Sequence, residues 1–276
     1  NKEYSLYSVD AFNKVFHSRK HGVNLTEQSG TEKNVANKEY KVKIVAEITT
    51  NHFGDMDRLK SMIVAAKEAG ADYIKLQKRD VETFYSEEKL QSAYNSPFGS
   101  TFRDYRRGIE LNLQQFEFVD QFCKEIGIRW FASILDKPSF EFIKQFDPEI
   151  IKLPSTISEH TEYLSSVADT FTKDVVISTG YTEKAYESYI LDTFKKARNI
   201  YLLQCTSAYP SKNEDTQIGV VRHYYNISKR DDRIIPGFSS HDIGSLCSML
   251  SVAAGARMIE KHVKFGDVAW SHFDEV

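Results

Sequence analysis

From Val42 onward, short apolar runs alternate with longer segments in which apolar residues recur every three or four positions. Eight of the short runs are rich in Ile, Val, Leu and aromatic residues, as is typical of strands buried on both faces. These predicted strands are 42–48, 73–77, 129–133, 150–153, 175–178, 200–205, 234–238 and 257–261. Helical periodicity occurs over 56–69, 114–126, 139–146, 161–171, 183–197, 216–228 and 243–253.

The alternation of strand and helix, repeated along the chain, predicts a parallel sheet. Eight such strands joined by right-handed crossovers can close into a (β/α)8 TIM barrel, which we expect over 41–276. Residues 1–40 are polar and irregular, and are predicted to be an N-terminal extension or linker. Residues 78–112 form a Tyr- and Arg-rich insertion after the second strand, on the side where barrel enzymes place their active sites. We expect the Tyr-rich part of this insertion, 85–107, to be a packed lid, and the alternative that it is also a binding platform stays open.

The composition excludes several classes of protein. Hydrophobic residues make up 41% and charged residues 27% of the 276 positions, which excludes a disordered chain and a small disulfide scaffold. Lys and Arg number 36 against 39 Asp and Glu, without a long basic block, so nucleic acid is not an expected partner. No apolar run approaches the roughly 20 residues that span a bilayer.

Three widely spaced cysteines, Cys123, Cys205 and Cys247, match no zinc spacing and are odd in number. Together with the absence of a signal-peptide pattern at the N-terminus, they predict reduced thiols in a cytoplasmic protein. We therefore expect small-molecule substrates and no membrane partner.

Polar residues lie at or just after nearly every predicted strand. They are Glu47, Lys75, Gln77, Ser133, Lys152, Ser155, Ser178, Thr179, Thr206, Ser207, Tyr209, Ser239, His241, Glu260 and His262. Residues two apart on a strand point the same way, so Lys75 shares a side with Gln77, and Glu260 with His262. Because burying unpaired charge is costly, a set at so many strand ends indicates a functional site.

The chemistry of this set suggests anion binding beside a metal. Two lysines from different strands, with serine hydroxyls, can hold a phosphate or a carboxylate. His241 and His262 on neighbouring strands can bind a divalent metal, with water and substrate in the remaining positions. Alternatively, a histidine near a strand end can be structural, and Lys75 can be a salt-bridged scaffold residue. Lys261 is expected to point toward the helix layer.

Four further histidines, His52, His160, His223 and His272, are expected at the surface.

The chain from Val42 to Val276 resembles the sialic acid synthase family, in segments that occur in the family's order. These are VAEITTNHFGDMDRLKSMIVAAKEAGADYIKLQ, IIKLPS, VVISTG, LLQCTSAYP, GFSSHDIG and GARMIEKHV. The resemblance implies a barrel that condenses phosphoenolpyruvate with an N-acylmannosamine-like aldose. It also implies a divalent metal, Mn or Mg, release of phosphate by C–O cleavage, a nine-carbon 2-keto acid product and a homodimer.

The resemblance assigns roles by motif. The catalytic residues would be Glu47, Lys75, Lys152 and Tyr209. Phosphoenolpyruvate would be held by Lys75, Ser133, Lys152, Ser155, Ser178, Ser207, Tyr209 and Ser239. The sugar would contact Gln77, Tyr209 and Asp274, and the metal would bind to His241 and His262.

The chain departs from the family pattern at several points. Ser240 stands where the family has Asp, which removes a carboxylate that can tune metal affinity. The family's Ser-Thr-Pro-Phe after the third strand is here Ala132-Ser133-Ile134-Leu135. The family's Gly-Pro-Asp segment after the last strand is replaced by AWSHFDEV, so Asp274 is only a candidate for the sugar-binding Asp. We expect residues 41–276 to hold the family's barrel and not its C-terminal antifreeze-like domain.

Two alternatives remain open at this point. One is a synthase of another 3-deoxy-2-keto sugar acid, using a different or a phosphorylated aldose, for which Arg103, Arg106 and Arg107 would be suitable. The other is a non-catalytic barrel module in polysaccharide biosynthesis.

Overall fold

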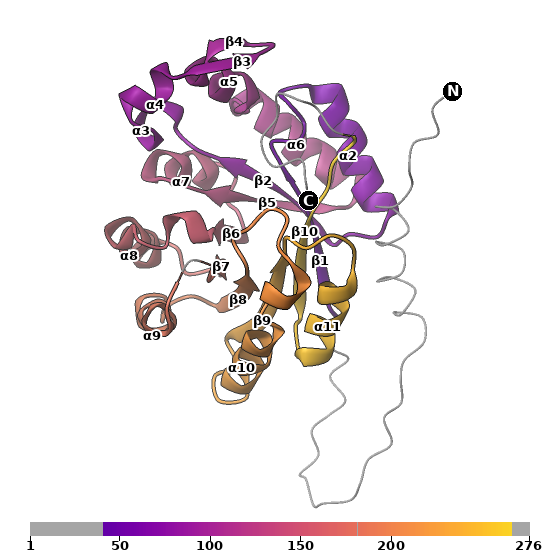
Figure 1. Ribbon diagram of the computed structural model, residues 1–276, viewed down its shortest axis with the longest axis vertical. Helices are drawn as coiled ribbons and strands as arrows, with labels where there is room; N and C mark the ends of the chain where they lie inside the picture. The colour runs from indigo at the N-terminus through magenta and orange to yellow at the C-terminus, as the bar shows by residue number, and fades with distance from the viewer. Residues whose placement is uncertain (1–40, 181, 267–276) are drawn as a thin grey trace, which may run out of the picture.

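The computed structural model describes residues 41–180 and 182–266 of the chain. Parallel strands close a barrel in the order β1–β10–β9–β8–β7–β6–β5–β2 (Figure 1). Their bounds are β1 Lys43–Thr49, β2 Tyr73–Lys78, β5 Arg129–Ile134, β6 Ile150–Leu153, β7 Asp174–Ser178, β8 Asn199–Cys205, β9 Ile234–Ser240 and β10 Met258–His262. All eight predicted strands are present, with ends shifted by at most two residues, and the predicted barrel is confirmed.

Helices surround the barrel in the connections between strands (Figure 1). They are α2 Met56–Glu68, α6 Leu113–Ile126, α7 Lys137–Lys144, α8 Thr161–Thr170, α9 Lys184–Thr193, α10 Ile218–Ser228 and α11 Leu246–Ala254. Side chains and glycines set their ends. Asp55 accepts hydrogen bonds from the first turn of α2, and Gly127 ends α6 in the left-handed conformation.

The predicted helix ends are wrong at two places. α9 ends four residues earlier than expected, because Phe194 leaves the helical conformation. α11 begins three residues later than expected, after a loop in which Gly244 has a φ of 87°. None of the described helices is long and apolar enough to cross a bilayer.

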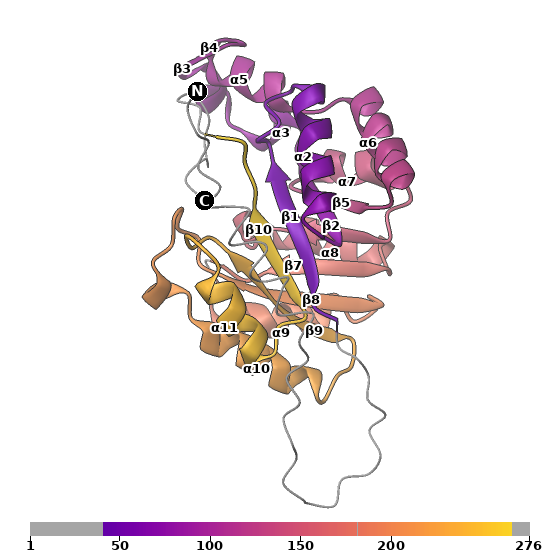
Figure 2. The same ribbon diagram turned by 90° about the vertical axis from the view of Figure 1, so that its right-hand side faces the viewer.

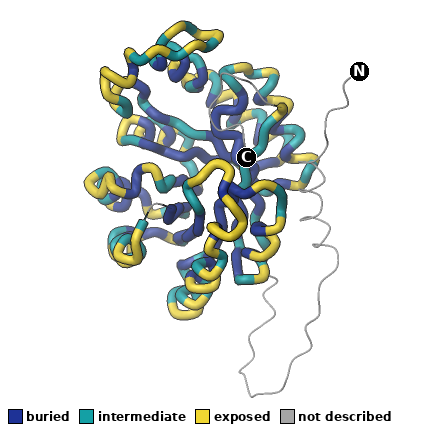
Figure 3. The backbone as a smooth tube through the Cα atoms, viewed as in Figure 1, coloured by how far each residue is buried: buried dark blue, intermediate teal, exposed yellow. Residues whose placement is uncertain are grey.

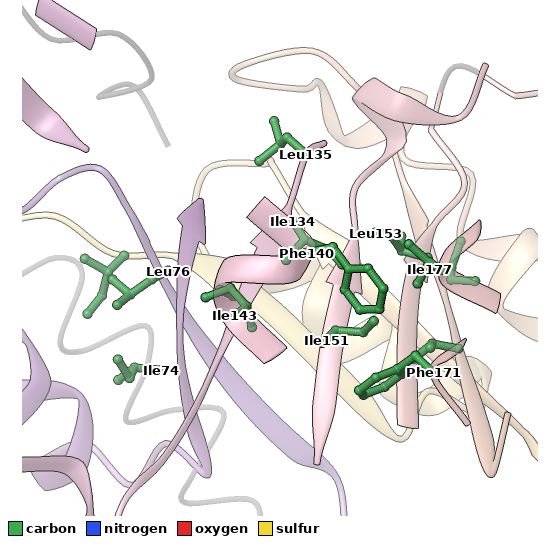
Figure 4. Close-up of a cluster of buried hydrophobic side chains, with 14 of the residues drawn as sticks. Ile74, Leu76, Ile134, Leu135, Phe140, Ile143, Ile151, Leu153, Phe171 and Ile177 are labelled. Atoms are coloured by element: carbon green, nitrogen blue, oxygen red, sulfur yellow. The ribbon is translucent and has the colours of Figure 1, made fainter. Parts of the chain in front are cut away.

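The main core lies between the strands and the surrounding helices. Phe140 and Ile143 of α7 pack with Ile134 of β5 and Ile151 of β6 (Figure 4). Strands and inner helix faces are buried, whereas the outer helix faces are exposed (Figure 3). Alternate residues of each strand therefore face this layer, and the others face the barrel interior.

The barrel interior changes from apolar to polar along the strands. An apolar layer is formed by Val45, Tyr73, Phe131, Ile150, Val176, Tyr201, Leu203 and Met258. Val45 is in register with Tyr73, and Glu47 with Lys75, two residues further along both strands. The apolar layer therefore forms the floor beneath the charged residues at the carboxyl ends of the strands.

The insertion after β2 consists of short elements: α3 Val81–Phe84, α4 Glu87–Gln91, β3 Ala93–Ser96, β4 Gly99–Thr101 and α5 Phe102–Ile109. They share a small core in which Tyr85 and Tyr94 pack against Leu90, Phe102 and Tyr105. Figure 2 shows β3, β4 and α5 beyond the arrowhead of β1, at the carboxyl end of the barrel. The insertion is packed, as predicted, and it covers the side on which the polar residues lie.

Candidate functional site

A cavity of about 470 Å³ opens at the carboxyl ends of the strands. It is lined by the predicted site residues Glu47, Lys75, Gln77, Ser133, Lys152, Ser155, Ser178, Ser207, Tyr209, Ser239, His241 and His262. Asp274 lies outside the described residues, as does His272. Residues that are distant in the sequence thus share one concave surface, although their individual roles stay predictions.

Lys75 lies at the centre of a buried network of charges. Its Nζ atom is 2.9 Å from Ser133 Oγ and 3.4 Å from Oε1 of Glu260, and it also forms an ion pair with Glu47. Burial lowers the pKa of Lys75 to about 7, although the Glu260 carboxylate opposes this shift. Lys75 is therefore salt-bridged, as one interpretation of the sequence expected, and it also lines the cavity.

Lys152 and Glu260 form the other half of the network. Lys152 Nζ lies 3.1 Å from both carboxylate oxygens of Glu260 and donates a hydrogen bond of 2.7 Å to Ser178. Ser239 donates to Glu260 at 2.9 Å. Burial alone would raise the pKa of Glu260, but Lys152 and Lys75 together lower it below its usual value. Two ammonium groups and two carboxylates thus balance one another on the cavity wall.

Hydroxyl groups line the cavity beside the lysines. Ser155 Oγ lies 3.3 Å from Ser207 Oγ. A Cβ atom at Gly180 would lie 2.4 Å from Ser207 Oγ, 2.6 Å from Cys205 Sγ and 3.2 Å from Ser155 Oγ. Only a glycine fits at position 180 without moving these groups. The resulting cluster of donors next to two lysines is suited to a phosphate group.

The two predicted metal ligands lie side by side. The ring centroids of His241 and His262 are 5.4 Å apart, and Tyr209 stacks on His241 at 4.1 Å. His241 Nδ1 donates to the Thr206 carbonyl at 2.6 Å, which leaves its Nε2 lone pair available. His262 Nδ1 lies 3.2 Å from Thr49 Oγ1.

Burial keeps both imidazoles in the state that binds metals. It lowers the pKa of His241 to about 4 and lowers that of His262 well below its ordinary value. Neutral rings with Nδ1 held by a neighbour fit a divalent ion such as Mn. No group of three or more His, Cys, Asp or Glu residues that could hold a metal occurs in 41–180 and 182–266. The remaining ligands of an ion at this pair would therefore be water and substrate.

Ser240, which stands where the family has Asp, belongs to a buried polar network. Ser240 donates to Asp242 Oδ1 at 2.6 Å, and Lys261 Nζ donates to Ser240 Oγ at 2.7 Å. Asp242 is fully buried and follows His241 directly. Lys261 does not line the cavity, as expected, and instead joins β10 to the end of β9.

Two residues of the site, Glu260 and Arg79, have no role in the sequence analysis. Glu260 was noted at a strand end, but its contact with both lysines depends on barrel closure. Arg79 lines the cavity and belongs to the basic insertion, which was the available signal for it. Of the three arginines noted for a phosphorylated aldose, Arg106 lines the cavity, whereas Arg103 and Arg107 pair with surface carboxylates on Glu87 and Glu82.

The surface prediction for His52 is wrong, because this residue is 2% exposed and its Nδ1 accepts from the Gly54 amide at 3.0 Å. His160 and His223 are exposed, as expected, and the three cysteines are free and buried.

Comparison with known proteins decides the family. The profile of the NeuB family matches residues 62–274. The chain belongs to the NeuB family. N-acetylneuraminate-9-phosphate synthase of Mus musculus is 33% identical over 234 residues, which are 84% of this chain and 64% of that protein. Pseudaminic acid synthase of Campylobacter jejuni is 32% identical over 244 residues, which cover 82% of this chain and 66% of that enzyme.

The solved structure of a sialic acid synthetase has the same fold as this chain. The N-acetylneuraminic acid synthetase of Leptospira borgpetersenii superposes with a TM-score of 0.69 and 26% identity, covering 81% of this chain and 73% of that one. The chain thus spans less than two thirds of the length of the mouse relative, and most of the length of the solved structure. The resemblance inferred from the motifs is confirmed.

Proposed function

We propose that this NeuB-family barrel condenses phosphoenolpyruvate with an N-acylmannosamine-like aldose, giving a nonulosonic acid and phosphate. The observation that carries the proposal is the placement of two buried lysines and two neutral imidazoles around one cavity. The named activities of the synthase relatives support it. The cavity volume also lies in the range of small-molecule sites.

Phosphoenolpyruvate would bind over the lysines and serines. Lys75 and Lys152 already contact Glu260, so an incoming phosphate or carboxylate would share these ammonium groups with it. The hydroxyls of Ser155 and Ser207 would donate to the phosphate oxygens. Charge-assisted hydrogen bonds from several strands would hold the anion in one orientation.

The reaction would proceed by attack of the enol methylene carbon on the aldehyde carbon of the open-chain sugar. Positive character develops at the enol carbon, where Glu47 is suited to stabilise charge and to guide a water molecule. The tetrahedral intermediate would then lose phosphate by cleavage of its C–O bond, and Lys75 and Lys152 would stabilise the leaving group. Gln77 and Tyr209 would contact the sugar.

His241 and His262 would hold the divalent ion, Mn or Mg, which would polarise the aldehyde when bound. The protein itself fixes the orientation of the two imidazole rings. The Thr206 carbonyl orients His241, and Thr49 lies within hydrogen-bond distance of His262.

The direct test is the release of phosphate from phosphoenolpyruvate with a panel of aldoses, with and without added Mn or Mg. We expect release with an N-acylated hexosamine and a nine-carbon keto acid by mass spectrometry. A Lys152→Met variant should lose this activity, whereas Lys144→Met, on the outer face of α7, should keep it. No release with any aldose under any metal condition would refute the proposed reaction.

A further inference from the structure

The two histidines of the site lie just beyond the last paired residues of their strands. The ladder between β9 and β10 ends with Ser240 opposite Lys261, and His241 and His262 are the next residues of the chain. On its other side β10 is held further, because Glu47 of β1 is in register with His262. The sheet therefore fixes the backbone of His262 but not that of His241.

The side chain of Lys261 continues the connection where the ladder ends. Its Nζ atom donates to Ser240 Oγ at 2.7 Å and to the backbone carbonyl of Asp242 at 2.6 Å. These two acceptors belong to the residues directly before and after His241, so one ammonium group holds this short segment from both sides. Since Lys261 also directly precedes His262, the same side chain connects the two imidazole-bearing segments.

Ser240 and Asp242 are suited to keep this ammonium group in place. Both residues are fully buried, and Ser240 Oγ donates to Asp242 Oδ1 at 2.6 Å. The serine hydroxyl therefore accepts from the Lys261 ammonium and donates its single proton to the carboxylate, which links a cation to an anion. Breaking either link would leave a buried charged group without its partner, so the network has one strongly favoured arrangement.

His241 is held on its other side by the loop after β8. Its Nδ1 donates to the Thr206 carbonyl at 2.6 Å, and its own carbonyl accepts from the Ser211 amide at 2.8 Å. Thr206 orients the ring, whereas Lys261 holds the backbone from which the ring projects. Because bonds between a metal and its ligands keep their lengths to within about 0.2 Å, a small shift of this backbone would change how well both rings reach one ion.

We propose that Lys261 is a positioning residue for the metal site, and that it sets the separation of the His241 and His262 rings. It does not line the cavity, and it acts through Ser240 and the Asp242 carbonyl. The inference rests on the proposed binding of a divalent ion to the two histidines. Groups that hold a ligand in this way typically change metal affinity by about 10- to 100-fold.

The test measures binding of Co²⁺ to the protein without substrates, by titration calorimetry and by the visible absorption of the bound ion. Co²⁺ binds nitrogen ligands more tightly than Mn²⁺ does. Its absorption also changes with the geometry of its ligands. We expect the wild-type protein to bind Co²⁺ at a site that His262→Ala removes. Lys261→Met keeps the length of the side chain and removes its donors, so it should weaken this binding by about 10- to 100-fold and alter the spectrum.

Lys43→Met is the matched control. Lys43 is also a partly buried lysine on a barrel strand, and it donates to the Tyr201 hydroxyl, but it lies at the opposite end of the barrel. Its substitution should lower the thermal stability, as that of Lys261 does, and should leave the Co²⁺ affinity and spectrum unchanged. Thermal unfolding of the same preparations thus separates a general loss of stability from a loss of ring positioning.

Ser240→Ala tests the link itself, because it removes the hydroxyl between the ammonium and the carboxylate and leaves both charges in place. It should weaken Co²⁺ binding by about 5-fold, as expected for the net loss of one hydrogen bond. In the double variant with Lys261→Met it should add nothing, because both changes break the same link. A further 5-fold fall would contradict the proposed route.

Unchanged Co²⁺ affinity and spectrum in folded Lys261→Met, or an equal loss in Lys43→Met, would overturn the positioning role while the metal pair stands. If Lys261→Met does not fold, unchanged binding by Ser240→Ala would have the same meaning. Absence of Co²⁺ binding to the wild type, or binding that survives in His262→Ala, would overturn the metal pair and this inference with it. Phosphate release from phosphoenolpyruvate tests the condensation separately.

Discussion

Gly180→Ala tests the proposed phosphate cradle with a single methyl group. The added Cβ would lie 2.4 Å from Ser207 Oγ and 2.6 Å from Cys205 Sγ, and ordinary contacts begin near 3.4 Å. Ser207 Oγ must therefore move by about 1 Å, and Cys205 has little room to move because it is 4% exposed. The substitution displaces a donor without removing any charge.

The expected cost has two parts. Overpacking of this kind destabilises a protein by about 1–3 kcal/mol. A displacement of about 1 Å in a group that positions substrate can reduce catalysis by about 100-fold. We therefore expect kcat/KM for phosphoenolpyruvate to fall by roughly 10- to 100-fold, chiefly through a higher KM.

The assay is steady-state phosphate release at varied phosphoenolpyruvate, with thermal unfolding measured on the same preparations. Gly219→Ala in α10 is the matched control, because no atom lies within 4 Å of its added Cβ. This control should raise the stability by about 0.4–1 kcal/mol and leave the kinetics unchanged. A folded Gly180→Ala protein with an unchanged KM would show that Ser155 and Ser207 do not hold the phosphate.

Three further predictions follow from the buried groups. Lys152→Ala removes the ammonium group that lies 3.1 Å from both oxygens of Glu260, so it should lower the stability of the protein by about 3 kcal/mol. It should also abolish phosphoenolpyruvate binding measured by calorimetry. An unchanged affinity would contradict the role of Lys152 in holding the phosphate. His262→Ala should eliminate metal-dependent turnover, and equal activity in chelator and in added Mn would argue against ligation. Burial lowers the pKa of His52 to about 3, so below about pH 6.5 the unfolded chain binds a proton that the folded protein does not. Its contribution to stability should therefore fall by about 1.4 kcal/mol per unit as pH decreases from 6.5 toward 3, and His52→Gln should flatten the pH profile of urea unfolding. Identical profiles for the two proteins would refute this reasoning.

The barrel was predictable because the sequence patterns that indicate its strands are local. Strands buried on both faces form short apolar runs, and parallel strands bring their carboxyl ends to one rim. The sequence pattern therefore predicts that Lys75, Lys152 and His241 lie at the same rim. The motif resemblance added roles that spacing alone does not assign.

The insertion and the charge pairing were not predictable in the same way. α3 and α4 have four and five residues, too few for a period, and depend on packing of Tyr85 and Phe102 across the insertion. Glu260 acquires its partners only through contacts between strands that are distant in the sequence. His52 is buried by a loop in which Phe53 and Gly54 have positive φ angles, a conformation that a polar sequence pattern does not reveal.

The pairing of β1 with β10 closes the barrel between the first and last described strands, which lie side by side in Figure 2. Nearly the whole folded chain separates them, so this contact has a high loop-closure cost and a high contact order. During synthesis, β1 leaves the ribosome long before β10 and has an unpaired edge on that side until β10 arrives. Glu47 is in register with His262 across this seam, so the site can be assembled only when the last strand docks. Partially synthesised chains should therefore be both inactive and prone to edge-to-edge association.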